Sequence, residues 1–244
     1  APPDRYWGHY KEDVRNFVVD NMMQFDFDTG PFSHKVLVGI DYTLFEQDRR
    51  EGYSCVAYYP GCFEAMTIPL NVYNPVYGQS FNYGYSNGFD SRSTQLGVYL
   101  QDQMKVGDRV SFVLGVRRDR ATSEATLSPK DTIDATTFKV GVIAEVFKGF
   151  SPFASYSESF SPIFGGDFYG NPYKPQQGEQ YEAGIKWQPF RNSLVTPAYF
   201  DIEDSNFLTS DPTNLQNFIQ SGVIGSKGVE LEAEVSFDMG LRVN

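Results

Sequence analysis

The chain of 244 residues is long enough for one large β domain or two smaller ones. Its net charge of -11 disfavours nucleic acid, whose phosphates would be repelled, and fits simple solubility equally well. No run of 18 apolar residues exists, so a transmembrane helix is excluded. A membrane β-barrel is not excluded by the mean hydropathy of -0.39, because alternating strands keep that average low.

Alternation of apolar and polar residues with a period of two dominates the chain and predicts strands. It occurs, with varying clarity, in nine segments: 17–27, 34–44, 94–104, 110–118, 136–146, 153–160, 181–187, 194–202 and 223–237. We expect consecutive strands to pair antiparallel. The apolar rows predict an outward direction for Val98, Leu114, Val140, Ile185 and Val229, and the polar rows an inward direction for Tyr99, Arg117, Lys139 and Glu230.

The connections between these segments fall into two classes that alternate strictly. Short ones lie at 28–31, 106–108, 148–149, 188–189 and 238–240, and long ones at 46–92, 121–134, 160–178 and about 205–221. An up-and-down antiparallel sheet with turns at one end and loops at the other produces this order, whereas Greek-key sandwiches do not favour it.

Charge placement favours a wall that faces lipid. The middles of the apolar rows are nearly free of charge, and the exceptions, Arg118, Glu158, Lys227 and Asp102, lie near the ends of the segments. Aromatic residues near the short turns fit an interfacial girdle: Phe25, Phe27, Phe147, Phe150, Trp187, Phe190 and Phe237. A soluble barrel or sandwich with an ordinary apolar core remains the alternative on this pattern alone.

The two cysteines, Cys55 and Cys62, lie in a segment rich in tyrosine, proline and glycine. They lack the additional ligands of a zinc site, so we expect an oxidising compartment and a disulfide between them.

The sequence contains no recognisable catalytic arrangement, and we expect neither an enzyme nor a metal site. His9 and His34 are not part of an HExxH, Cys-His or Ser-His-Asp pattern. The alternating Glu230, Glu232 and Glu234 are better explained by one solvated face of a strand than by metal ligands. Aromatic residues instead crowd the long connection 46–92, and such a density predicts a binding role or packing of the loop against itself.

Several strand motifs, in order, resemble the barrel of TonB-dependent siderophore receptors, most closely those for ferrichrome and related hydroxamate siderophores. Two early ones are Val38-Gly39-Ile40-Asp41-Tyr42 and Leu70-Asn71-Val72-Tyr73-Asn74-Pro75. Further matches occupy residues 97–103, 114–119, 152–160, 175–186 and 226–233.

This resemblance implies an all-β, antiparallel up-and-down transmembrane barrel of 22 strands with a plug domain in its lumen. Residues 1–244 would supply nine strands and the start of a tenth of one barrel domain, without the plug and the remaining strands. It also implies a Gram-negative outer-membrane location, a ferric siderophore as ligand rather than a cofactor, and energised uptake through the TonB complex. Outer-membrane lipid, lipopolysaccharide, and phage or bacteriocin would be further partners.

Four aromatic residues around the two cysteines are our candidates for contact with the siderophore: Tyr53, Tyr58, Tyr59 and Phe63. Tyrosine offers a ring for the apolar surface of a siderophore and a hydroxyl for its carbonyl and hydroxamate oxygens. A passive porin, a surface adhesin and a soluble carbohydrate-binding β-sandwich are the alternative functions.

Overall fold

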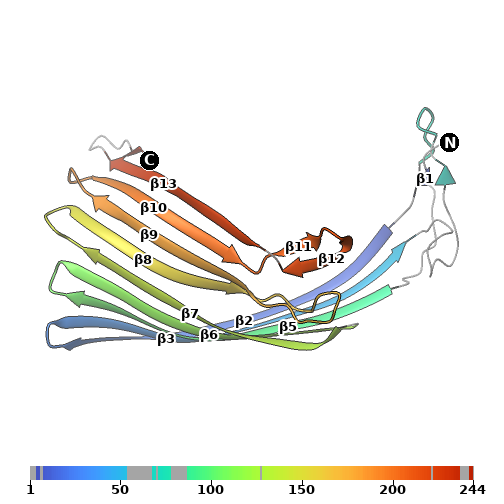
Figure 1. Cartoon of the computed structure of the whole chain (residues 1–244), viewed down its shortest axis with the longest axis horizontal. Helices are drawn as coiled ribbons and strands as arrows, with labels where there is room; N and C mark the ends of the chain where they lie inside the picture. The colour runs from blue at the N-terminus through green and yellow to red at the C-terminus, as the bar shows by residue number, and fades with distance from the viewer. Residues whose placement is uncertain are drawn as a thin grey trace. The chain divides into compact units, whose positions relative to one another are not determined.

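The computed structural model describes residues 4–5, 8–53, 68–69, 71–77, 87–126, 128–220, 222–236 and 242–243. Ten strands form one antiparallel sheet, in the order β14-β13-β10-β9-β8-β7-β6-β5-β3-β2 (Figure 1). Their bounds are β2 Gly8–Thr29, β3 Phe32–Tyr53, β5 Asn87–Val106, β6 Val110–Ala125, β7 Ser128–Ala144, β8 Phe150–Ser161, β9 Gln176–Trp187, β10 Ser193–Ser205, β13 Val223–Ser236 and β14 Arg242–Val243.

The strands confirm the nine alternating segments and the start of a tenth strand. Each long strand pairs with its neighbour along the chain, as an up-and-down sheet requires, and the described sheet is open because β2 and β14 are its end strands. Two small pairs accompany it: β1 (Asp4–Arg5) with β4 (Ile68–Pro69), and β11 (Leu208–Asp211) with β12 (Asn214–Gln220). Among the described residues we find no helix long and apolar enough to cross a membrane.

Several strands run further than the apolar alternation predicts. β3 continues to Tyr53, and β6 and β7 almost meet, so residues 121–134 are a strand hairpin rather than the predicted loop. The connection at 205–221 likewise contains the hairpin of β11 and β12. Our predicted boundaries were wrong here because both faces become polar beyond the apolar stripe. Backbone pairing continues there, although the period-two contrast in hydropathy that reveals a strand is lost.

The short turns use glycines in a left-handed conformation. Gly30, between β2 and β3, has φ of 61°, and Gly107, between β5 and β6, has φ of 56°. A side chain at such a position would be strained, which explains why glycine stands in these tight connections.

The described residues divide into two units. The first comprises residues 1–17, 43–94 and 123–130, with the long-loop ends of β2, β3, β5, β6 and β7. The second comprises residues 18–42, 95–122 and 131–244, with the remaining lengths of those strands and all of β8, β9, β10 and β13. The units are treated separately below.

The register of the second unit assigns its side chains to two faces. Lys139 is opposite Ser157, which is opposite Gln180, and this row continues through Ile202 to Ser226. Glu230 lies four residues after Ser226 on β13, so both side chains are on the same face, which is the face of Lys139. A Cβ on Gly115 would touch the Cβ of Lys139, and Gly115 shares its face with Arg117.

Arg117 in turn lies over the ring of Tyr99, at 5.7 Å from the guanidinium carbon to the ring centroid. Tyr99, Arg117, Lys139 and Glu230 therefore share one face, which we call the polar face. By alternation, Val98, Leu114, Val140, Ile185 and Val229 share the opposite, apolar face. This division of all nine residues is as predicted.

Few described side chains are buried, because a single sheet has no second layer over it. The buried apolar residues are Ala121, Ile133, Ala135 and Ala198. The apolar face instead presents large side chains to its surroundings, including Val98 (48% exposed), Leu114 (44%) and Val229 (78%). An exposed apolar face of this extent requires an apolar neighbour.

Candidate functional site

The polar face of the second unit is organised around Arg117. Its guanidinium donates to Asp41 on β3 at 2.6 and 3.0 Å, and to Asp119 on its own strand β6 at 2.8 and 2.6 Å. Gln95 on β5 donates to Asp119 at 3.0 Å. The Asp119 side chain is only 1% exposed, and Arg117 and Gln95 together provide hydrogen bonds to both of its oxygens.

Two side chains of the polar face reach two strands away across a glycine. The side chain of Arg117 on β6 covers Gly97 on β5, where an added Cβ would lie 2.0 Å from the guanidinium, and reaches Asp41 on β3. Tyr99 on β5 covers Gly39 on β3, where a Cβ would lie 2.1 Å from the ring, and donates its hydroxyl to Asp20 on β2 at 3.2 Å. These arrangements hold large side chains flat against the wall.

The polar face of the second unit is predominantly acidic. By the strand register, its acidic residues are Asp20, Asp26, Asp28, Asp41, Asp119, Asp131, Glu182, Asp204, Glu230, Glu232 and Glu234. Its basic residues are Lys35, Lys105, Arg117, Lys139, Lys186 and Arg242, and Arg242 pairs with Glu234.

The four charged residues that the sequence places at the ends of the apolar segments each have a polar partner, although Arg118 lies near the middle of β6 because that strand continues to Ala125. Arg118 donates to Thr136 at 2.8 Å, and Lys227 to Asp201 at 3.2 Å. Near the short turn of β2 and β3, His34 contacts Asp102 at 2.7 Å and stacks on Phe27 at 5.0 Å between ring centroids. Glu158 accepts from the hydroxyl of Tyr156 at 2.7 Å and from the backbone N–H of Phe138 at 3.0 Å.

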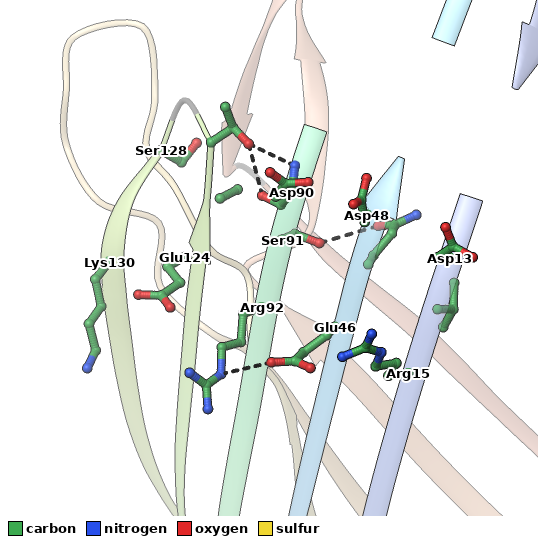
Figure 2. Close-up of a pocket in the computed structure, with 14 residues that line it drawn as sticks. Asp13, Arg15, Glu46, Asp48, Asp90, Ser91, Arg92, Glu124, Ser128 and Lys130 are labelled. Atoms are coloured by element: carbon green, nitrogen blue, oxygen red, sulfur yellow. Dashed lines mark hydrogen bonds and ion pairs between the residues drawn. The ribbon is translucent and has the colours of Figure 1, made fainter. Parts of the chain in front are cut away.

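The first unit carries a groove of about 1030 Å³ on one strand face, shown in Figure 2. Charged side chains from five strands line it: Asp13, Arg15, Glu46, Asp48, Asp90, Arg92, Glu124 and Lys130. Acidic and basic groups alternate across it, and Arg92 pairs with Glu46 at 3.6 Å. Such a surface suits a charged, hydrated neighbour rather than hydrocarbon.

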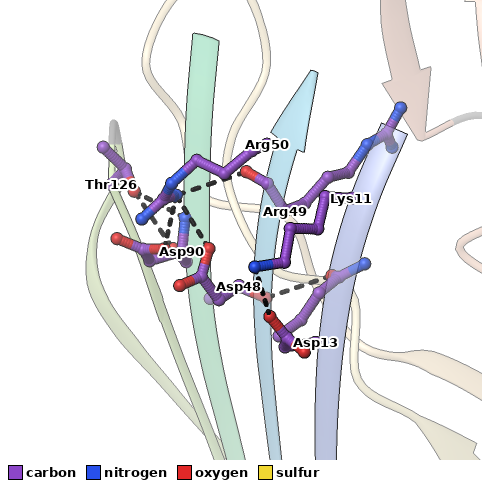
Figure 3. Close-up of polar contacts among 9 residues, drawn as sticks. Lys11, Asp13, Asp48, Arg49, Arg50, Asp90 and Thr126 are labelled. Carbon is purple, nitrogen blue, oxygen red and sulfur yellow. Dashed lines mark hydrogen bonds and ion pairs between the residues drawn. The ribbon is translucent and has the colours of Figure 1, made fainter. Parts of the chain in front are cut away.

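Beside this groove, Arg50 joins two neighbouring strands (Figure 3). It contacts Asp48 on its own strand and Asp90 on β5, each at 2.9 Å. The hydrogen bond to Asp90, with the charges of Asp48 and Asp90, raises the pKa of Arg50. Asp90 also receives the backbone N–H of Thr126 on its carbonyl at 2.9 Å, which ties β5 to the end of β6.

The opposite strand face of the first unit contains a second set of contacts. The guanidinium of Arg49 lies 4.8 Å from the ring centroid of Tyr10 and pairs with Glu51 at 2.9 Å. Gln47 donates to Glu12 and accepts from Ser91.

The predicted ligand residues fall mainly outside the described residues. Tyr58, Tyr59 and Phe63 lie there, as do Cys55 and Cys62, so their proximity and the disulfide stay predictions. Tyr53 is described only as the last residue of β3. Among the described residues, no group of three or more His, Cys, Asp or Glu side chains is arranged to hold a metal ion.

Sequence reasoning placed Arg117 on the polar face but missed its network with Asp41 and Asp119. A signal was present, because Gly39 and Gly97, the glycines that Tyr99 and Arg117 cover, stand inside β3 and β5. A glycine in the middle of a strand indicates close approach of a neighbouring group.

Three comparisons place the chain among known proteins. Residues 2–244 match the family model described as TonB dependent receptor-like, beta-barrel. The ferrichrome outer membrane transporter/phage receptor of Escherichia coli is 31% identical over 100% of this chain and 34% of its own length. The ferrioxamine B receptor of Salmonella typhimurium is 37% identical over 91% and 31%. The chain thus spans about a third of these relatives.

Solved structures share the fold. The ferric preacinetobactin receptor of Acinetobacter baumannii superimposes with a TM-score of 0.72 at 22% identity, over 94% of this chain and 35% of that one. The FpvAI–pyocin S2 complex gives 0.73 at 20% identity, over 96% and 32%.

Proposed function

The chain belongs to the family of TonB-dependent receptor-like β-barrels, and from this membership we propose that its parent protein imports a ferric siderophore. The family is one of receptors and transporters rather than enzymes, and it places the chain in the outer membrane of a Gram-negative bacterium. The named relatives bind ferrichrome and ferrioxamine B, which makes a hydroxamate siderophore the preferred ligand class.

The main support for this proposal is that the chain belongs to this family and that its sheet has one apolar and one polar face. The apolar face has an uncharged stretch between Asp102, near the short turns, and Arg118 and Lys227, further toward the long connections. Lipid contact requires such a stretch, because a charge at the bilayer midplane costs about 2–4 kcal/mol. The polar face carries ion pairs such as Arg117 with Asp41, which suit a polar lumen. We propose that residues 1–244 form part of a 22-stranded barrel that encloses a plug domain.

Ligand binding is assigned to the long connections, with Tyr53, Tyr58, Tyr59 and Phe63 as contacts. In support, Tyr53 is the last residue of β3, at the end of that strand next to the long connection. A disulfide between Cys55 and Cys62 would restrict this segment and reduce the ordering cost of binding. One alanine substitution at a buried ring would weaken ferric-siderophore binding about 5- to 150-fold, since such a contact contributes about 1–3 kcal/mol.

The outer membrane supplies further partners. The charged groove of the first unit is suited to the phosphates and sugars of lipopolysaccharide, through cations such as Arg15 and Lys130. Phage or bacteriocin binding is proposed because one relative is named a phage receptor and one structural neighbour is a pyocin complex.

The decisive experiment is uptake of ⁵⁵Fe-siderophore by cells that carry the full-length parent as their only receptor for that chelate. We expect saturable uptake that requires both the receptor and a functional TonB complex. Uptake that persists unchanged without TonB would favour a passive porin, and cell adhesion without any iron uptake would favour an adhesin. Surface expression of the receptor is measured in each strain, so that loss of uptake is not confused with loss of protein.

A further inference from the structure

The polar face of the second unit has eleven acidic and six basic side chains, so carboxylates outnumber cations about two to one. The apolar face of this unit has six acidic and three basic side chains, so the net excess is five carboxylates on the polar face (eleven minus six) and three on the apolar face (six minus three). The larger net negative charge therefore lies on the face that we propose borders the lumen.

The cations of this face are largely engaged. Arg117 is held by Asp41 and Asp119, which leaves that cluster with a net negative charge. The ammonium of Lys186 lies 5.8 Å from the ring centroid of Phe153. Lys35 and Lys105 lie close to the short turns, so they are remote from the long-loop entrance.

Several carboxylates remain available to a solute. Glu230 and Glu232 on β13 are exposed and Glu182 on β9 is half-buried, and all three lie on the polar face of strands that pair with β10. A surface of one sign between low-dielectric walls concentrates its field in the enclosed space, which attracts solutes of opposite charge and repels those of the same charge.

We propose that the receptor selects its cargo by charge: it prefers a cationic ferric chelate and discriminates against an anionic one. This inference rests on the proposed function, because it names the charge class of the imported siderophore. Selection arises from the field of the whole polar face, in addition to whatever shape recognition the loops provide.

The test uses three ferric chelates with the same trihydroxamate iron centre. One ends in a primary amine and is cationic, the second has that amine acetylated and is neutral, and the third has it succinylated and is anionic. Binding to the purified full-length receptor and ⁵⁵Fe uptake by cells are measured for each. We expect affinity to fall in the order cation, neutral, anion, with about a tenfold span at low salt that narrows as ionic strength rises.

A pair of variants locates the effect. The double variant Asp204→Asn with Glu232→Gln removes two polar-face charges and should reduce the preference for cation over anion about fourfold. Glu179→Gln removes one charge from the opposite face of β9 and should leave the preference unchanged. The chelate series on the unaltered receptor does not depend on whether these variants fold.

The outcomes separate the two claims. If no chelate binds or enters, the proposed function is wrong. If the three chelates bind equally, or the anion binds best, uptake stands and charge selection by this face is wrong. A preference that the double variant and the Glu179→Gln control alter equally would also contradict the assignment to the polar face.

Discussion

At the residue scale, the polar face shows how a β-sheet accommodates large side chains that lie flat against it. Tyr99 and Arg117 each cover a glycine of the neighbouring strand and bind a carboxylate one strand further on. The glycines are therefore part of the contact, because a methyl group at either position would displace the side chain above it.

Gly184 offers the sharpest test of this packing. A Cβ there would lie 2.6 Å from the backbone oxygen of Pro197 and 2.7 Å from the ring of Phe153, whereas at Gly141 the nearest atom would be 3.6 Å away. We expect Gly184→Ala to destabilise the full-length receptor by about 1–3 kcal/mol, and Gly141→Ala to change its stability little. Urea unfolding of both variants in detergent is the measurement, and equal stability would contradict the account.

The Arg117 network predicts a difference between neighbouring arginines. Arg117→Ala would leave Asp41 and the buried Asp119 without their cation, so we expect a loss of about 1–3 kcal/mol in unfolding free energy. Arg118→Ala removes a 58% exposed side chain on the opposite face and should cost less than about 1 kcal/mol. The same unfolding assay compares them; a larger effect at Arg118 would refute the assigned network.

At the element scale, sequence and structure agree where the faces differ in hydropathy. The segments 94–104 and 110–118 lie within β5 and β6, because apolar and polar residues alternate strongly there. The alternation disappears in residues 121–134, where hydroxyl and charged side chains such as Thr122 and Asp134 occupy the face that is apolar nearer the short turns. Sequence reasoning therefore missed that hairpin, because the backbone hydrogen bonds that pair its strands do not require a recognisable pattern of side chains.

The candidate site was less predictable than the strands. The alternation of side chains along each strand placed Arg117, Lys139 and Glu230 on one face. The residues that they contact, however, depend on which strands pair and in which register. The contact of Tyr99 with Asp20 joins residues 79 apart in sequence, and no local pattern identifies such a pair. Ligand contacts in the long connection 46–92 were proposed from composition, which names residue types without fixing their positions.

The two faces of β5 should respond oppositely to one added charge. Leu100 lies on the apolar face and is 46% exposed, whereas Gln101 lies on the polar face. We expect Leu100→Arg to lower the yield of folded receptor in membranes, at a cost of about 2–4 kcal/mol if the residue lies near the midplane. Gln101→Arg should be tolerated. Heat-modifiable mobility on gels measures the folded fraction, and equal yields of the two variants would contradict the face assignment.

At the scale of the whole molecule, the structure describes one open sheet whose function depends on the complete receptor. An exposed sheet edge within hydrocarbon leaves backbone groups without hydrogen-bond partners, so the described strands require closure into a barrel. The family membership, the alternation of turns with longer connections and the two-faced sheet are consistent with this single architecture.

The central claim is that one face of this sheet meets lipid and the other meets a polar lumen. Spin labels placed singly at residues 96–101 of the full-length receptor in bilayers test it most directly. We predict that labels at 96, 98 and 100 will be accessible to oxygen dissolved in lipid, and that labels at 97, 99 and 101 will be more accessible to a water-soluble nickel chelate or shielded from both. A reversed pattern, or oxygen accessibility that does not alternate, would contradict the account.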